Sequence, residues 1–126
     1  MTNFSFSLRG DGLGKITIGS YEEHFVSDLN FWKVSDYIEH WNVAREVLTT
    51  GTSVSFITSI TEPENSNFIR SWVCYYDNGE LVFQEHMLFL DEPDFEFNID
   101  EPHKNVRPYE SITEEGEKIS EWRIKI

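Results

Sequence analysis

The sequence has few cysteines, few basic residues and no long hydrophobic run. Cys74 is the only cysteine among 126 residues, which excludes an internal disulfide framework and a zinc site built from several cysteines, and favours a reducing compartment. No apolar run approaches the roughly 20 residues that span a bilayer, and the N-terminal residues lack the basic and apolar segments of an export signal. We therefore expect a cytoplasmic protein that does not enter a membrane.

Basic residues are scarce enough to exclude a class of ligand. Ten Lys and Arg stand against 23 Asp and Glu, for a formal net charge of −13. Nucleic acids and anionic membranes are negatively charged and repel such a protein. Binding to their phosphates requires cationic side chains, which displace the condensed counterions. Over residues 62–101, eleven carboxylates and the single basic residue Arg70 account for ten of the net negative charges. Because self-repulsion of this kind costs folding stability, we infer that the acidic stretch serves a basic partner.

Large apolar side chains are abundant enough to build one core. The chain has ten Phe, five Tyr and four Trp, and 39% of its residues are hydrophobic. That composition is too apolar for a disordered chain, even at this net charge. The length is that of one ordinary domain, so we expect a single domain over residues 1–126.

Alternating apolar residues predict strands over much of the chain. The strand-like segments are residues 4–9, 16–18, 21–31, 54–60, 68–76 and 81–90, of which the first three form a meander of two or three strands. Between the last two, Asn78 and Gly79 suit the positive φ angles of a type I′ hairpin turn. Residues 109–113 and 118–126 are expected to pair as a final hairpin.

One helix is predicted, with Ser35 as its N-cap and an end near Thr49. Its apolar face is formed by Tyr37, Trp41, Ala44 and Leu48, which recur at helical spacing. We therefore expect an α+β fold, in which a twisted antiparallel sheet of about six to eight strands carries this one main helix on a face.

Titratable groups with catalytic or metal-binding potential are scattered along the chain. The four histidines, none at the spacing of a helical metal pair, are His24, His40, His86 and His103. Cys74 lies mid-strand without cationic neighbours, which indicates a buried, inert thiol. The acidic residues lack the register of an EF-hand, and the glycines at 10–14 lack the dinucleotide-binding pattern. We predict no catalytic residue, no metal and no cofactor.

The acidic segment that follows Leu90 is the candidate binding surface. Phe95, Phe97 and Ile99 alternate there with carboxylates, so apolar side chains can anchor a segment that presents negative charge. The carboxylates that we expect to contact a partner are Asp91, Glu92, Asp94, Glu96, Asp100 and Glu101, with Glu62 and Glu64 as additions. The alternative interpretation is a solvated surface that binds nothing.

Three stretches of the C-terminal half resemble a known family. They are residues 83–92 (FQEHMLFLDE), 107–110 (RPYE) and 115–122 (EGEKISEW), and residues 29–32 (LNFW) before the helix add to the likeness. They are similar to small bacterial immunity proteins of contact-dependent growth inhibition (CDI) and related polymorphic toxin systems. The resemblance implies a cytoplasmic, non-enzymatic protein that binds the toxin domain of its cognate effector, often a basic nuclease, and blocks its active site.

Two other functions remain open from the residues alone. One is an adaptor or oligomeric module that binds a protein without regard to charge, with an association rate nearly independent of salt. The other is a small enzyme that uses clustered carboxylates, which requires titratable groups converging in a pocket with shifted pKa values. Our leading hypothesis is an immunity protein whose carboxylates occupy the positions of substrate phosphates in a basic toxin.

Overall fold

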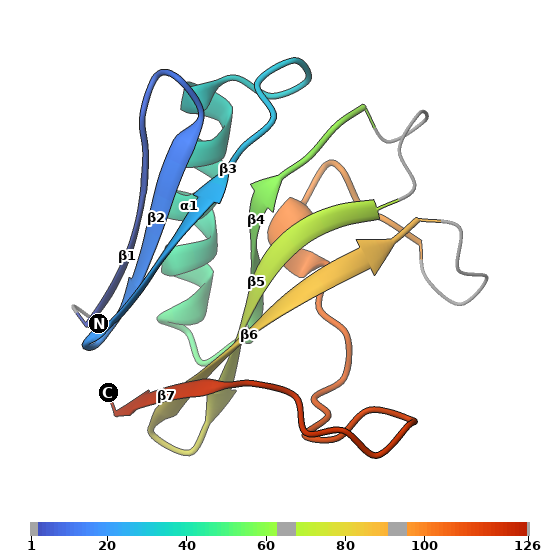
Figure 1. Ribbon diagram of the computed structural model, residues 1–126. Coiled ribbons are helices and arrows are strands. Elements are labelled where there is room, and N and C mark those ends of the chain that lie inside the picture. The colour runs from blue at the N-terminus through green and yellow to red at the C-terminus, as the bar shows by residue number, and fades with distance from the viewer. Residues whose placement is uncertain (1–2, 63–67, 91–95, 126) are drawn as a thin grey trace.

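The fold consists of two antiparallel sheets and one main helix (Figure 1). A computed structural model describes residues 3–62, 68–90 and 96–125. In chain order the elements are β1 (Phe4–Leu8), β2 (Leu13–Ile18), β3 (Tyr21–Val26), α1 (Val34–Leu48), β4 (Val54–Ser59), β5 (Phe68–Asp77), β6 (Glu80–Phe89), the 3-10 helix η2 (Pro102–Lys104) and β7 (Trp122–Lys125). The predicted α+β class is confirmed, with seven strands that are divided between a three-stranded and a four-stranded sheet.

The three-stranded sheet is a meander in the order β1-β2-β3. Its inward side chains include Phe4, Ile16 and Ile18, all buried, as the alternation predicts. The third strand ends at Val26, so the expectation of a strand to residue 31 is wrong. The cause is a change of partner: the Ser27 hydroxyl donates to the Thr58 carbonyl, which draws the chain from this sheet toward β4.

The four-stranded sheet has the order β4-β5-β6-β7. The turn between β5 and β6 has φ angles of 45° at Asn78 and 86° at Gly79, which confirms the predicted hairpin. The final hairpin is wrong except for one bridge between Ile112 and Lys118. Residues 122–125 instead pair with β6, because Trp122 packs against the buried Trp72 at 5.4 Å between ring centroids.

Helix α1 begins two residues earlier than predicted. Its N-cap position is Lys33 rather than Ser35, and the Asp36 carboxylate accepts the Lys33 N–H at 2.9 Å, which satisfies an otherwise unpaired donor. The predicted apolar stripe is buried, and His40 lies buried within it. No helix in the described ranges is long and apolar enough to cross a membrane.

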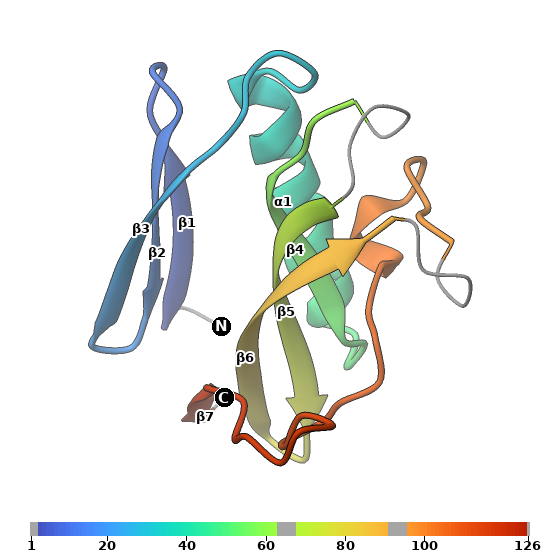
Figure 2. The same ribbon diagram turned by 45° about the vertical axis from the view of Figure 1, so that its right-hand side comes forward.

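The core lies where the two sheets and the helix meet (Figures 1 and 2). The ring of Phe4 packs against Phe56 and Phe83 of the larger sheet, at 5.8 and 5.1 Å between centroids. Helix α1 contacts both β1 and β4. Figure 2 shows η2 on the same side of β4 as α1, and η2 contacts both elements. This placement brings the acidic segment before η2 beside the first turns of the helix.

Candidate functional site

The predicted binding carboxylates fall into two groups. Those outside the described residues are Glu64, Asp91, Glu92 and Asp94. Those that the structure describes, all exposed, are Glu62, Glu96, Asp100 and Glu101. Glu62 follows β4, whereas the other three lie in the segment that leads into η2.

The segment that leads into η2 is held by a buried asparagine. Asn105 accepts the Asn98 N–H at 2.8 Å and donates to the carbonyls of Asn98 and Pro102, each at 2.9 Å. Glu101 forms an ion pair with Lys104 at 2.9 Å, and this hydrogen bond lowers the pKa of the Glu101 carboxyl. The backbone that carries Asp100 is therefore fixed locally, while the charge of Glu101 has a partner within the chain.

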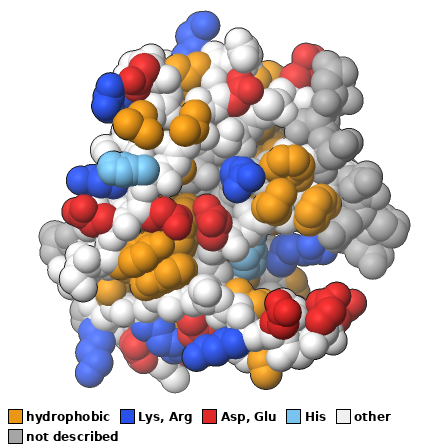
Figure 3. Space-filling model, viewed as in Figure 1, with side chains coloured by type: hydrophobic (Ala, Val, Ile, Leu, Met, Phe, Trp, Pro, Cys, Tyr) orange, Lys and Arg blue, Asp and Glu red, His pale blue; other side chains and the backbone are white. Residues whose placement is uncertain are grey.

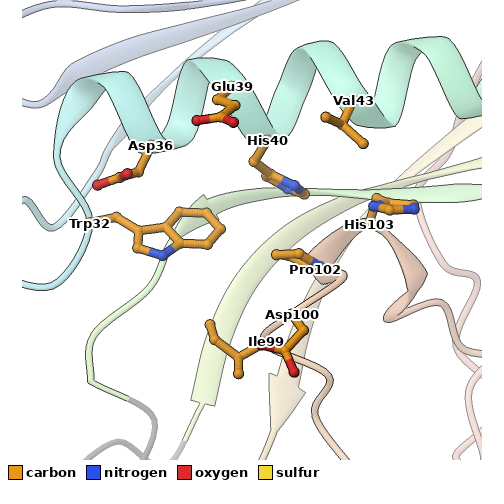
Figure 4. A pocket seen from close by; sticks show the side chains of 9 residues that line it. All are labelled: Trp32, Asp36, Glu39, His40, Val43, Ile99, Asp100, Pro102 and His103. Carbon is orange, nitrogen blue, oxygen red and sulfur yellow. The ribbon is translucent and has the colours of Figure 1, made fainter.

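Asp100 lies at a pocket that the helix and the acidic segment form together (Figure 4). The cavity has a volume of about 250 Å³. It is lined by Trp32, Asp36, Glu39, His40, Val43, Ile99, Asp100, Pro102 and His103. Figure 4 shows the helix residues on one side and residues 99–103 on the other, with the His40 ring projecting between them. Three carboxylates thus share one pocket, and its described lining residues include no Lys or Arg.

The two histidines of the pocket are neutral near pH 7. Burial lowers the pKa of His40 to about 3, with a smaller contribution from His103, and burial also lowers the pKa of His103. The Nε2 atom of His40 accepts the Ile57 N–H at 2.8 Å, so Nδ1 carries the ring proton. Among the described residues Nδ1 has no hydrogen-bond partner. The histidines consequently do not offset the charge of the carboxylates.

This arrangement is better suited to binding than to proton transfer. A general acid or base works best with a pKa near the operating pH, whereas His40 stays neutral down to about pH 3 with its Nε2 occupied. Cys74 is buried, as predicted, and burial raises the pKa of its thiol. Within the described ranges no group of three or more His, Cys, Asp or Glu could hold a metal ion. The exposed carboxylates can pair with a cation.

Sequence reasoning found one of the three carboxylates of this pocket. Asp36 and Glu39 lie within the predicted helix but off its apolar stripe, and neither belongs to the predicted binding carboxylates. Their spacing of three places them on one helix face, which is a usable signal. Nothing local indicated that Asp100 and His103 would lie against that face, because the two segments are far apart in the sequence.

A second surface feature is an apolar patch where β5 begins and β6 ends. Phe68, Met87 and Phe89 are exposed there, and the rings of Phe68 and Phe89 lie 6.3 Å apart. Figure 3 shows hydrophobic side chains gathered over this part of the larger sheet. Glu85 lies on β6, the strand of Met87 and Phe89, and burial raises the pKa of its carboxyl. Patches of this composition are typical of protein-binding surfaces.

Comparison with known proteins identifies relatives along most of the chain. Residues 27–126 match the family described as CdiI N-terminal domain. A curated relative, "Immunity protein CdiI" of Enterobacter cloacae subsp. cloacae, is 32% identical over 112 residues, which are 88% of this chain and 77% of the relative. A chain of the solved "CdiA-CT/CdiI toxin and immunity complex from Enterobacter cloacae" superposes with a TM-score of 0.80 at 29% identity, covering 97% of this chain and 90% of that one.

Proposed function

Because this chain belongs to the CdiI immunity protein family, we propose that it binds and neutralises the C-terminal toxin domain of a cognate CdiA-type effector. Its match to a chain of a toxin and immunity complex extends over nearly the whole fold, which supports a shared mode of action. We place this action in the cytoplasm, as the single cysteine and the resemblance to CDI immunity proteins suggest. The protein acts by binding, not by catalysis.

The chemistry of the toxin follows from the charge of this chain. We infer a basic toxin domain of the nuclease type, since a surface that binds phosphates is the natural complement of clustered carboxylates. The observation that carries this inference is the convergence of Asp36, Glu39 and Asp100 on one pocket without a lining Lys or Arg. Glu96 is exposed in the same segment, four residues before Asp100. The proposed contacts include the four carboxylates that lie outside the described residues.

Neutralisation would proceed by occlusion of the toxin's active site. Long-range attraction between the acidic surface and a basic cleft accelerates association. Carboxylates then take the positions of substrate phosphates and accept charge-assisted hydrogen bonds from Lys and Arg of the toxin. Substrate and immunity protein therefore compete for the same cationic groups.

Co-purification with the product of the gene immediately upstream tests this function. We expect the tagged chain to retain the C-terminal domain of that product, and its expression to rescue growth of cells that produce the toxin. Expression of the same toxin without this chain is the control for toxicity. A toxic upstream domain that is neither bound nor neutralised would contradict the proposal.

A charge-independent binding module is the second candidate, and the apolar patch of Phe68, Met87 and Phe89 favours it. The two functions differ in their response to salt. An acidic surface that steers a basic partner loses association rate steeply between about 50 and 200 mM salt, whereas apolar docking does not. Stopped-flow association at these salt concentrations separates them. A rate that is unchanged would favour the apolar patch as the interface.

A further inference from the structure

The pocket between α1 and the segment that leads into η2 contains two groups that no described residue of the chain compensates. The first is its negative charge: the carboxylates of Asp36, Glu39 and Asp100 line it without a cationic lining residue. The second is the Nδ1–H donor of His40, a residue of the pocket lining with only 6% exposure, for which the described part of the chain offers no hydrogen-bond partner. A buried donor without an acceptor costs about 1–3 kcal/mol in general, so a ligand that supplies an acceptor gains from it.

The two unsatisfied groups call for a ligand that carries both a cation and an acceptor. A metal ion supplies no acceptor for His40. A lysine or arginine residue supplies both, because its side chain is cationic and its main chain has a carbonyl oxygen. The aromatic ring of Trp32 adds a surface on which an alkyl stem or a guanidinium can pack.

The size of the cavity agrees with one inserted side chain. Pockets for drug-sized molecules and cofactors measure roughly 300 to 1,000 Å³, while this one measures about 250 Å³. Its walls are partly apolar, with Val43, Ile99 and Pro102 beside the carboxylates. Such walls desolvate the methylene groups of a long cationic side chain and leave its charged end beside the acids.

We propose that this pocket receives a lysine or arginine side chain from a loop of the toxin domain, and that a main-chain carbonyl of the same loop accepts the Nδ1–H of His40. The inference rests on the proposed toxin-binding function and assigns it a specific anchor site. The pocket is then the place where one toxin residue is desolvated, as in the central contacts that dominate protein interfaces. The remaining acidic residues contribute mainly to the rate of association.

Charge removal at the pocket, compared with equal charge removal elsewhere, tests the anchor. The test variant is Glu39→Gln with Asp100→Asn, and the matched control is Glu46→Gln with Glu117→Gln; all four carboxylates are exposed. We expect the test variant to raise the dissociation rate from the upstream-encoded toxin domain about 30-fold or more, and the control no more than about threefold. Biolayer interferometry measures the rates, and circular dichroism verifies that each variant is folded.

The outcomes separate the anchor from the function. If the wild-type chain fails to bind the toxin domain, the proposed function is overturned and the anchor with it. If the wild type binds but the two double variants dissociate at equal rates, the function stands and the anchor is overturned. As a second measurement, NMR of ¹⁵N-histidine-labelled protein should show the Nδ1–H resonance of His40 moving downfield in the complex; an unchanged resonance would overturn the proposed carbonyl contact.

Discussion

Two of the regions in which helix α1 meets the rest of the protein are built in different ways. In the first, which we call the α1–β4 seam, side chains of Tyr37, His40 and Trp41 bond to the backbone of β4 and the residue after it. Trp41 donates to the Ile57 carbonyl at 2.7 Å, His40 accepts the Ile57 N–H at 2.8 Å, and the Tyr37 hydroxyl accepts the Ile60 N–H at 3.1 Å. The second region is the pocket beside Asp100.

The pocket presents the opposite arrangement, since its carboxylates are exposed. Asp36 bonds to the backbone of its own helix terminus, and within the described ranges no ion pair links Asp36 or Glu39 to the segment that leads into η2. The difference shows how one helix serves two purposes. The seam joins the helix to β4 through three side-chain hydrogen bonds, whereas the carboxylates of the pocket stay exposed to solvent.

The largest effect is expected from removing the central side chain of the seam. Trp41→Ala deletes a ring that is 5% exposed and leaves the Ile57 carbonyl without its donor. We expect the free energy of unfolding to fall by about 3–5 kcal/mol, measured by urea denaturation. Ile38→Ala, at an exposed position of the same helix, is the control and should cost less than about 1 kcal/mol. Equal losses would show that the seam does not hold the helix.

Titration of His40 offers a second way to probe the seam. Its pKa is about 3 in the folded state and 6.5 as an ordinary histidine, so below pH 6.5 the unfolded chain takes up a proton that the folded chain refuses. The stability that this group contributes is complete above pH 6.5 and is lost as the pH falls toward 3, by up to about 1.4 kcal/mol per pH unit.

His40→Gln keeps an acceptor for the Ile57 N–H but removes this titration. We expect its unfolding free energy to fall less steeply than that of the wild type between pH 6 and 4, a difference of about 2 kcal/mol over these two units. His24→Gln, at an exposed position on β3, is the matched control. Parallel pH profiles for the wild type and His40→Gln would rule out a buried, neutral His40.

The smallest effect concerns the segment that forms the other wall of the pocket. Asn105→Ala removes three hydrogen bonds to Asn98 and Pro102, so we expect a loss of about 2 kcal/mol in the unfolding free energy. Amide hydrogen exchange should increase over residues 96–104 more than elsewhere. Asn42→Ala, at an exposed position of α1, should leave exchange in that segment unchanged. Uniform exchange in both variants would mean that other contacts hold the wall.

Features of the fold that depend only on the residues of one short segment could be predicted from the sequence. The hairpin at Asn78 and Gly79 depends on two backbone angles, and the buried stripe of α1 depends on spacing within one helix. The strand at the C-terminus could also be predicted, because apolar and polar residues alternate there. Trp122 and Ile124 pack against the core as this alternation requires. Their strand partner could not be predicted, because residues 109–113 and β6 were both available and only the packing of Trp122 on Trp72 favours β6.

The sequence by itself determined the α+β composition, the single helix and the excess of acid, because these depend on residue type and short-range periodicity. The tertiary structure alone decided that Asp100 joins Asp36 and Glu39 around His40. Contacts between distant segments arise from how whole elements pack, and no local pattern encodes them. The acid in the sequence indicated a basic partner, and the folded chain brings three of its carboxylates to the lining of one pocket.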